Sequence, residues 1–182
     1  LANGTLTPVS TTDGGVIWTG TFTPTDDVED ATNYISVGIA LTDLPGNAPL
    51  SGKNTSNYTI DTKEPVITAS QSFAVLESAA NTTSVGTVAA TDGGTLQAWT
   101  ITAGNGAGVF TINAATGEIT IADNTNLDYE GTTSYTLSLT VGDGGNRSAV
   151  ETVAINITDV NEFTPVVTAG QNTAIAENTA NN

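Results

Sequence analysis

Apolar residues recur at every second position in several short segments of this sequence, and this alternation is the feature that most constrains its fold. The clearest runs are Tyr135, Leu137, Leu139, Val141 and, further on, Val153, Ile155, Ile157. A strand sends successive side chains to opposite faces of a sheet, so these runs predict strands with one buried face. Turn sequences such as Asp92-Gly93-Gly94 and Asp143-Gly144-Gly145 separate the runs. Short strands at a spacing of roughly 8–12 residues favour an all-β sandwich.

Two near-repeats surround Pro65 and Pro165 and divide the chain. In each near-repeat, a strand ends in acidic residues, the chain continues through the proline, and a new strand follows. The distance in sequence between the two near-repeats indicates one sandwich per repeat. We therefore predict a β-sandwich over residues 1–64 that lacks its first, N-terminal strands, a complete sandwich over 65–161, and a linker with the first strands of a further repeat over 162–182. The expected fold is all-β, with tandem Greek-key sandwiches in a rod-like array.

The charge balance limits what the chain can bind. Lys and Arg total 3 against 19 Asp and Glu, the formal net charge is -16, and the sequence has no His and no Cys. So acidic a chain repels phosphate backbones and anionic surfaces, which argues against nucleic acid as a partner. Metals that need imidazole or thiolate, and hydrolases that need a His, are excluded as well. The sequence has no run of 18 apolar residues, so we expect no membrane insertion.

Most acidic residues between the two prolines lie at expected strand ends and turns. In chain order they include Glu77, Asp92, Asp128, Glu130, Asp143, Asp159 and Glu162. Calcium binds about 6–8 oxygen ligands, and loops at one end of a sandwich can supply them together. Aspartate also caps turns and keeps surfaces solvated. The spacing alone leaves both interpretations open.

The central segment contains, in this order, the stretches Leu76-Glu77-Ser78, Leu127-Asp128-Tyr129-Glu130, Val141-Gly142-Asp143 and Asp159-Val160-Asn161-Glu162. In the order and spacing of these stretches it resembles a bacterial cadherin-like repeat. The resemblance implies calcium ions between successive repeats. A lower site would use Glu77, Asp128, Glu130, Asp159, Asn161 and Glu162. An upper site would use Asp92, Asp143, the Asn105 carbonyl and linker acids such as Asp61. The paired Asp-x-Asp of that family is reduced here to Asp92 followed by two glycines, so the upper site would hold fewer ions.

The first segment contains the stretches Thr19-Gly20-Thr21-Phe22, Leu41-Thr42-Asp43-Leu44-Pro45 and Tyr58-Thr59-Ile60-Asp61. In these stretches it is similar to the bacterial Ig-like repeats of large secreted adhesins. Such repeats stack through calcium, which makes Asp43 and Asp61 candidate ligands. Asp43 could equally shape a turn. The acidic residues between positions 26 and 30 are expected to form a solvated loop.

These observations favour a calcium-binding structural or adhesion module of a secreted or cell-surface bacterial adhesin, and not an enzyme. Calcium is the expected cofactor, and neighbouring repeats of the same chain are the expected partners, with a cell-surface protein or glycan as a further partner. The expected location is extracellular, at the cell surface. The alternative is a glycan- or peptide-binding sandwich of the same kind of protein. Its candidate contact residues are the aromatics Tyr34, Tyr58, Tyr129 and Phe163.

Overall fold

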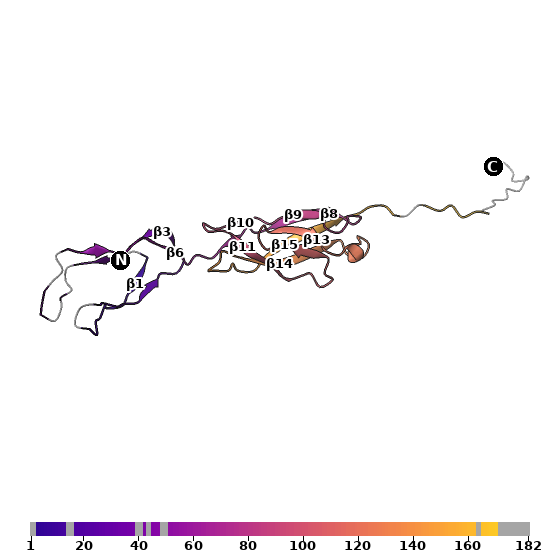
Figure 1. Cartoon of the computed structure of the whole chain (residues 1–182). Helices are drawn as coiled ribbons and strands as arrows, with labels where there is room; N and C mark the ends of the chain where they lie inside the picture. Colours follow the sequence, from indigo (N-terminus) through magenta and orange to yellow (C-terminus); the bar gives the residue numbers. More distant parts are fainter. Residues whose placement is uncertain are drawn as a thin grey trace, which may run out of the picture.

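The regular secondary structure of this protein is almost entirely β-strand within the residues that the structure describes. The computed structural model describes residues 3–13, 17–38, 42, 45–47, 51–162 and 165–170. Within these ranges the regular structure is β except for one 3₁₀ turn, η1 (Asn124–Asn126). No helix in the described part of the chain is long and apolar enough to cross a membrane. Two groups of strands lie end to end along the molecule (Figure 1). The prediction of an all-β fold is confirmed.

The first group consists of three short antiparallel pairs. They are β1 (Gly4–Leu6) with β2 (Phe22–Pro24), β3 (Glu29–Asn33) with β6 (Tyr58–Asp61), and β4 (Ser36–Val37) with β5 (Lys53–Asn54). Among the described residues up to position 64, Ile60 and Asn33 are the buried ones. The first group therefore has little apolar core and relies on hydrogen bonds.

The buried side chain of Asn33 links the strands of this group. Its Nδ2 donates to the backbone oxygens of Asp30 at 2.8 Å and Tyr58 at 3.3 Å, and its Oδ1 accepts from Asn3 Nδ2 at 3.0 Å. Buried polar groups are stable only when they are hydrogen-bonded in this way. The expectation of a solvated loop between positions 26 and 30 is wrong in part, because Glu29 and Asp30 belong to β3.

The second group is a sandwich of two sheets. One sheet has the order β11 (Gln97–Ala103), β14 (Ser134–Gly142), β15 (Glu151–Thr158) and β8 (Gln71–Leu76). The other has the order β12 (Phe110–Ile112), β13 (Glu118–Ile121) and β9 (Ser84–Thr87). A short pair, β7 (Val66–Ile67) with β10 (Ala90–Thr91), lies at the end that faces the first group (Figure 1).

The core of the sandwich comes from the predicted alternation. On β14, Leu137, Leu139 and Val141 are fully buried, and they share one apolar cluster with Ile119 and Ile121 of the facing sheet. The strands expected at residues 135–141 and 153–157 are therefore confirmed. Side chains of both sheets meet between them, as in other sandwiches.

The strand directions decide what lies at each end of the sandwich. β8 and β15 pair in parallel, whereas β14 runs antiparallel to β15. Residues that follow β8 and β15 therefore emerge at one end, and residues that follow β14 emerge at the other. The chain enters next to the first group and leaves at the opposite end (Figure 1).

The core predicts that the same change, Leu to Ala, has different effects on stability at a buried and at a half-exposed position. Leu137→Ala removes a fully buried side chain and should lower the free energy of unfolding by about 2–5 kcal/mol, because a cavity remains. Leu76→Ala removes a side chain that is 50% exposed, and it should cost less than half as much. Urea unfolding followed by the fluorescence of the buried Trp99 measures both. Equal losses would contradict this account of the core.

Candidate metal centres

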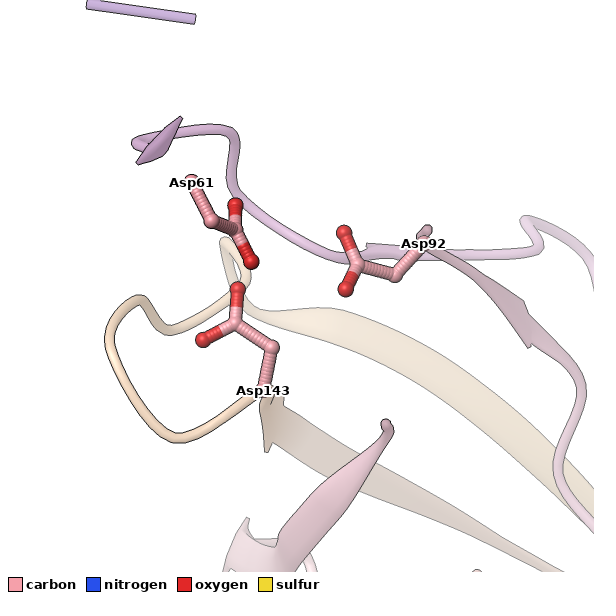
Figure 2. Close-up of side chains that lie close together, drawn as sticks. All are labelled: Asp61, Asp92 and Asp143. Carbon is pink, nitrogen blue, oxygen red and sulfur yellow. The ribbon is translucent and has the colours of Figure 1, made fainter. Parts of the chain in front are cut away.

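Three aspartate carboxylates meet where the two groups of strands join. One carboxylate oxygen from each of Asp61, Asp92 and Asp143 lies within 4.8 Å of the other two. Asp61 is the last residue of β6 in the first group, while Asp92 and Asp143 directly follow β10 and β14 of the sandwich. Figure 2 shows the three side chains converging from three separate segments. We refer to them as the junction group.

The turn after β14 holds Asp143 in place. Its Oδ1 accepts hydrogen bonds from the backbone N–H groups of Gly145 at 2.7 Å and Asn146 at 2.6 Å, and its Oδ2 accepts one from Asn146 Nδ2 at 3.0 Å. The backbone N–H of Asn146 is the main cause that lowers the pKa of Asp143 below its usual value. Donors to the charged form favour ionisation. The turn thus presents an ionised carboxylate at a defined position.

Asn146 also connects the sandwich to the first group, and the sequence reasoning missed it. Its Nδ2 donates to the backbone oxygen of Asp61 at 3.3 Å and lies 3.5 Å from Asp61 Oδ1. The sequence does contain a signal for this role. Asn146 lies three residues after Asp143 in Asp-Gly-Gly-Asn, where its side-chain amide can donate to the carboxylate that begins the turn. The neutral Asn146 amide therefore donates hydrogen bonds to two acidic residues without compensating the negative charge of either.

Asp92 contains an oxygen that the protein does not satisfy. Its Oδ2 accepts a hydrogen bond from the Gly94 N–H at 2.9 Å. Its Oδ1 is buried and has no hydrogen-bond partner within the part of the chain that the structure describes. A buried charged oxygen without a partner is costly. An ion at this position would remove that cost.

No cationic side chain donates to the junction group among the described residues. The donors to its carboxylates are backbone N–H groups and the Asn146 amide. The only arginine, Arg147, instead donates to the Thr140 hydroxyl at 2.7 Å. Three close carboxylates therefore lack a protein counter-charge, although like charges in proximity disfavour ionisation.

A second acidic group lies at the other end of the sandwich. Carboxylate oxygens of Glu77, Asp128 and Glu130 lie within 4.8 Å of one another. Glu77 directly follows β8, and Asp128 and Glu130 lie between η1 and β14. Glu77 is only 5% exposed, whereas the other two are exposed. We refer to these residues as the far-end group.

Glu77 joins three segments through its two oxygens. Its Oε2 accepts a hydrogen bond from the Tyr129 N–H at 2.7 Å, and its Oε1 accepts one from the Val160 N–H. The Tyr129 and Val160 donors, in that order, hold the pKa of Glu77 below its usual value. The buried carboxylate therefore stays ionised and ties the end of β8 to the linker.

The linker residues lie beside the far-end group. Glu162 is an exposed residue, yet partial desolvation of its carboxyl group, followed by the charges of Glu77 and Glu130, raises its pKa. Hydrogen bonding with the side chains of Glu162 and Asp159 contributes to the lowered pKa of Glu77. Asn161 lies between these two acids in the chain and is exposed. A fourth carboxylate thus crowds a group that already carries three.

One predicted ligand, Asn105, is not brought to either acidic group. Asn105 lies beyond the end of β11 that pairs with Ser138, while the start of β11 pairs with Gly142 next to Asp143. Its side chain closes a loop instead, because Nδ2 donates to the Phe110 oxygen at 2.7 Å and Oδ1 accepts from the Phe110 N–H at 3.1 Å. Asp43 falls outside the described residues.

The aromatic residues named for a glycan or peptide site have different surroundings. Tyr58 packs edge-on against Phe22, with ring centroids 5.6 Å apart, and Tyr129 packs against the sandwich core. Tyr34 is 59% exposed. Phe163 falls outside the described residues. These contacts give no support to a shared aromatic platform.

Both groups fit a hard cation. Their side chains offer carboxylate oxygens, which calcium prefers, and the chain has no imidazole or thiolate. The unsatisfied Oδ1 of Asp92 points to a missing ligand partner in the junction group. The side chains of both groups therefore offer the kind of oxygen ligands that calcium binds.

An all-β chain with two groups of strands arranged end to end is a tandem-domain protein. Residues 1–60 match the sequence model of the bacterial Ig-like domain, and residues 71–158 match that of the cadherin domain. The chain thus comprises a bacterial Ig-like domain followed by a cadherin domain, as the sequence resemblances predicted. Both are structural, non-enzymatic families, and cadherin domains are typically extracellular.

The curated relatives are large cadherin proteins. The chain is 36% identical over 78 residues to human Cadherin-related family member 2, which is 43% of this chain and 6% of that protein. It is 43% identical over 70 residues to human Protocadherin Fat 1, which is 37% of this chain and 2% of that protein. The chain therefore spans only a small part of the length of these relatives.

Solved cadherin ectodomains are also similar to this chain. Protocadherin Gamma B2 extracellular cadherin domains 3–6 match with a TM-score of 0.48 and 29% identity, over 54% of this chain and 23% of that one. The human Desmocollin-1 ectodomain matches with a TM-score of 0.48 and 26% identity, over 65% of this chain and 24% of that one.

The hydrogen bonds of Glu77 predict a pH-dependent effect of Glu77→Gln in calcium-free buffer. Because the folded-state pKa is lowered, ionised Glu77 stabilises the fold fully above its unfolded pKa of about 4.3, and this contribution is lost as pH falls through the folded pKa. The variant should be less stable than the wild type at pH 7, and the difference should shrink below about pH 4.3.

Urea unfolding at several pH values between about 3 and 7 would measure this difference. Glu64→Gln, which removes an exposed carboxylate, is the matched control and should leave stability nearly unchanged. A Glu77→Gln profile that coincides with the control would contradict the role given to Glu77.

Proposed function

We propose that this chain is a calcium-binding structural and adhesion module of a secreted or cell-surface bacterial adhesin. Calcium ions bound at the two ends of the cadherin domain would fix it to its neighbours. The neighbouring repeats of the same chain are the direct partners. The module acts mechanically, and no reaction is assigned to it.

The observation that carries this proposal is the junction group. Asp61 comes from the Ig-like domain, and Asp92 and Asp143 come from the cadherin domain. A cation shared by these carboxylates converts repulsion between the domains into a cross-link. Because the ligands lie on both sides of the domain boundary, binding would restrict the angle between the domains.

The proposed ligands follow the two acidic groups. Asp61, Asp92 and Asp143 would bind calcium at the junction. Glu77, Asp128 and Glu130 would bind it at the far end, joined by the linker residues Asp159, Asn161 and Glu162. Asp43 stays a proposed ligand of the Ig-like domain. Asn105 is not included, since it lies at the other end of β11 from Asp143.

The proposed domain limits place both groups at boundaries. An Ig-like domain would occupy residues 1–64, the cadherin domain residues 65–161, and a linker with the opening strands of a further repeat residues 162–182. Each acidic group then lies where two domains meet. An extracellular location at the cell surface fits such sites, because extracellular modules bind calcium with dissociation constants of about 10⁻⁴–10⁻³ M.

The expected stabilisation follows from these affinities. At about 10 mM calcium, one site with such a dissociation constant stabilises the folded state by about 1.4–2.7 kcal/mol. For a domain near 100 residues, about 1 kcal/mol shifts the midpoint of thermal unfolding by roughly 4–8 °C. Calcium should therefore raise the melting temperature of the cadherin domain by on the order of 5–20 °C.

The direct test is thermal unfolding in EDTA and then at millimolar calcium, with magnesium as the competing ion. The rise should be specific for calcium, and the double variant Asp128→Asn with Glu130→Gln should remove the part that the far-end group supplies. The pair Glu118→Gln with Glu151→Gln removes the same charge from other positions and should keep the full rise. If the wild type melts at one temperature in both buffers, the proposal fails.

The junction group predicts a change in shape. In small-angle scattering, calcium should narrow the range of interdomain angles, which makes the maximum dimension better defined and the chain more extended on average. Asp92→Asn with Asp143→Asn should abolish this response while keeping the fold, because both side chains lie in loops at the end of the sandwich. A response of equal size in the variant would show that the junction group does not control the rigidity between the domains.

A further inference from the structure

Gly93 and Gly94 follow Asp92 and occupy the space between the two domains at the junction group. A Cβ atom at position 94 would lie 2.9 Å from Asp92 Oδ2 and 3.3 Å from Asp61 Oδ2. Carboxylates from both domains thus approach the Gly94 backbone. A side chain at this position would occupy space that these oxygens now use.

Gly93 receives a different carboxylate. A Cβ atom at position 93 would overlap the carboxylate of Glu29, whose Oε1, Cδ and Oε2 are the three nearest atoms. Glu29 begins β3 of the Ig-like domain. It therefore reaches across the domain boundary to the residue next to Asp92. The backbone of Gly93 has no positive φ, so close approach and not backbone conformation is what the glycine allows.

The sheet of the Ig-like domain places Glu29 beside a member of the junction group. Glu29 and Asp61 are directly paired across the antiparallel strands β3 and β6. Like charges directly opposite each other destabilise a sheet. Neither carboxylate receives a hydrogen bond from a Lys or Arg in the described residues. This paired repulsion at the junction is relieved if a cation binds between the domains.

The junction group by itself has few ligand atoms for calcium. Three aspartates supply at most six carboxylate oxygens, and those of Asp143 already accept three hydrogen bonds. Calcium takes about 6–8 oxygens, and its affinity depends on the number of charged ligands. Glu29 does not belong to the carboxylates that lie within 4.8 Å of one another, but its carboxylate lies against Gly93, the residue that follows Asp92. It can add two oxygens from the Ig-like domain.

We infer that Glu29 is a further calcium ligand at the junction, and that Gly93 is the gap that admits it. The Ig-like domain then supplies Glu29 and Asp61, and the cadherin domain supplies Asp92 and Asp143. The site is complete only when the two domains are in contact. This inference rests on the proposed calcium-binding function and assigns its junction site to both domains.

The test is calcium titration of the full chain by calorimetry, with calcium ions alone as the ligand. The far-end variant Asp128→Asn with Glu130→Gln serves as the background, so that the junction site is titrated. Glu29→Gln should weaken binding by at least about ten-fold, the lower range for groups that support a metal site. Glu64→Gln removes a nearby exposed charge and should change the affinity by less than about two-fold, since exposed charges interact weakly.

A second pair of variants tests the gap itself. Gly93→Ala should weaken calcium binding as Glu29→Gln does, and combining both should be no worse than either alone, because each removes the same contact. Gly106→Ala is the matched control, since a Cβ atom there meets no other atom within 4 Å. Unfolding in calcium-free buffer shows that each variant is folded. The Asn146 side-chain amide in NMR spectra reports independently whether calcium reaches the junction.

The outcomes separate this inference from the proposal beneath it. If Asp92→Asn with Asp143→Asn abolishes binding but Glu29→Gln binds as tightly as the background, Glu29 is not a ligand and the proposed function stands. If calcium leaves the Asn146 amide unchanged in the wild type, no junction site exists and both ideas fail there. Weakening by Glu29→Gln and Gly93→Ala without additivity supports the inference.

Discussion

The parallel pairing of β15 with β8 is the constraint on which the rest of this structure depends. It makes the first long strand of the cadherin domain and its last strand run in the same direction. The chain therefore enters at one end of the sandwich and leaves at the other, which is what a linear array of domains requires. The same pairing brings Glu77, after β8, beside the linker that follows β15, and the Val160 N–H donates to it there. The antiparallel strand β14 sends Asp143 to the opposite end.

Electrostatics at both ends follow from this topology. Hydrogen bonds from the backbone and from one Asn side chain orient Asp143 and Glu77 and keep them ionised, so the protein stabilises the positions of the carboxylates more than it neutralises them. With 3 basic residues against 19 acidic ones, the chain has few counter-charges to offer. A divalent cation is the simplest physical compensation, and its binding would couple each domain end to its neighbour. The proposed calcium-dependent stiffening and the proposed junction site shared by both domains both rest on this shortage of basic residues.

The strands of the cadherin domain were predictable because each has one buried face. The alternation at Leu137 and Leu139 marks β14 without any knowledge of its partners. The Ig-like domain was harder, since its strands are short and only Ile60 and Asn33 are buried among its described residues. The acids of the candidate sites were also recognisable, and the structure brings Asp61, Asp92 and Asp143 together. Asn105 was misplaced because the sequence does not tell at which end of β11 a loop lies, and Glu29 was assigned to a solvated loop because its neighbours are acidic.

The sequence by itself determined the all-β class, the two kinds of domain and a set of possible ligands made of carboxylates without imidazole or thiolate, because hydrophobic period, motif order and residue type are local properties of the chain. The tertiary structure alone decided which acids share an end, that Asn146 joins Asp143 to Asp61, and that Glu29 lies against Gly93. These are contacts between residues far apart in the chain. These contacts depend on strand direction, on strand register and on the space that a glycine leaves by having no Cβ atom. The order of residue types along the chain does not show which distant residues these factors bring together.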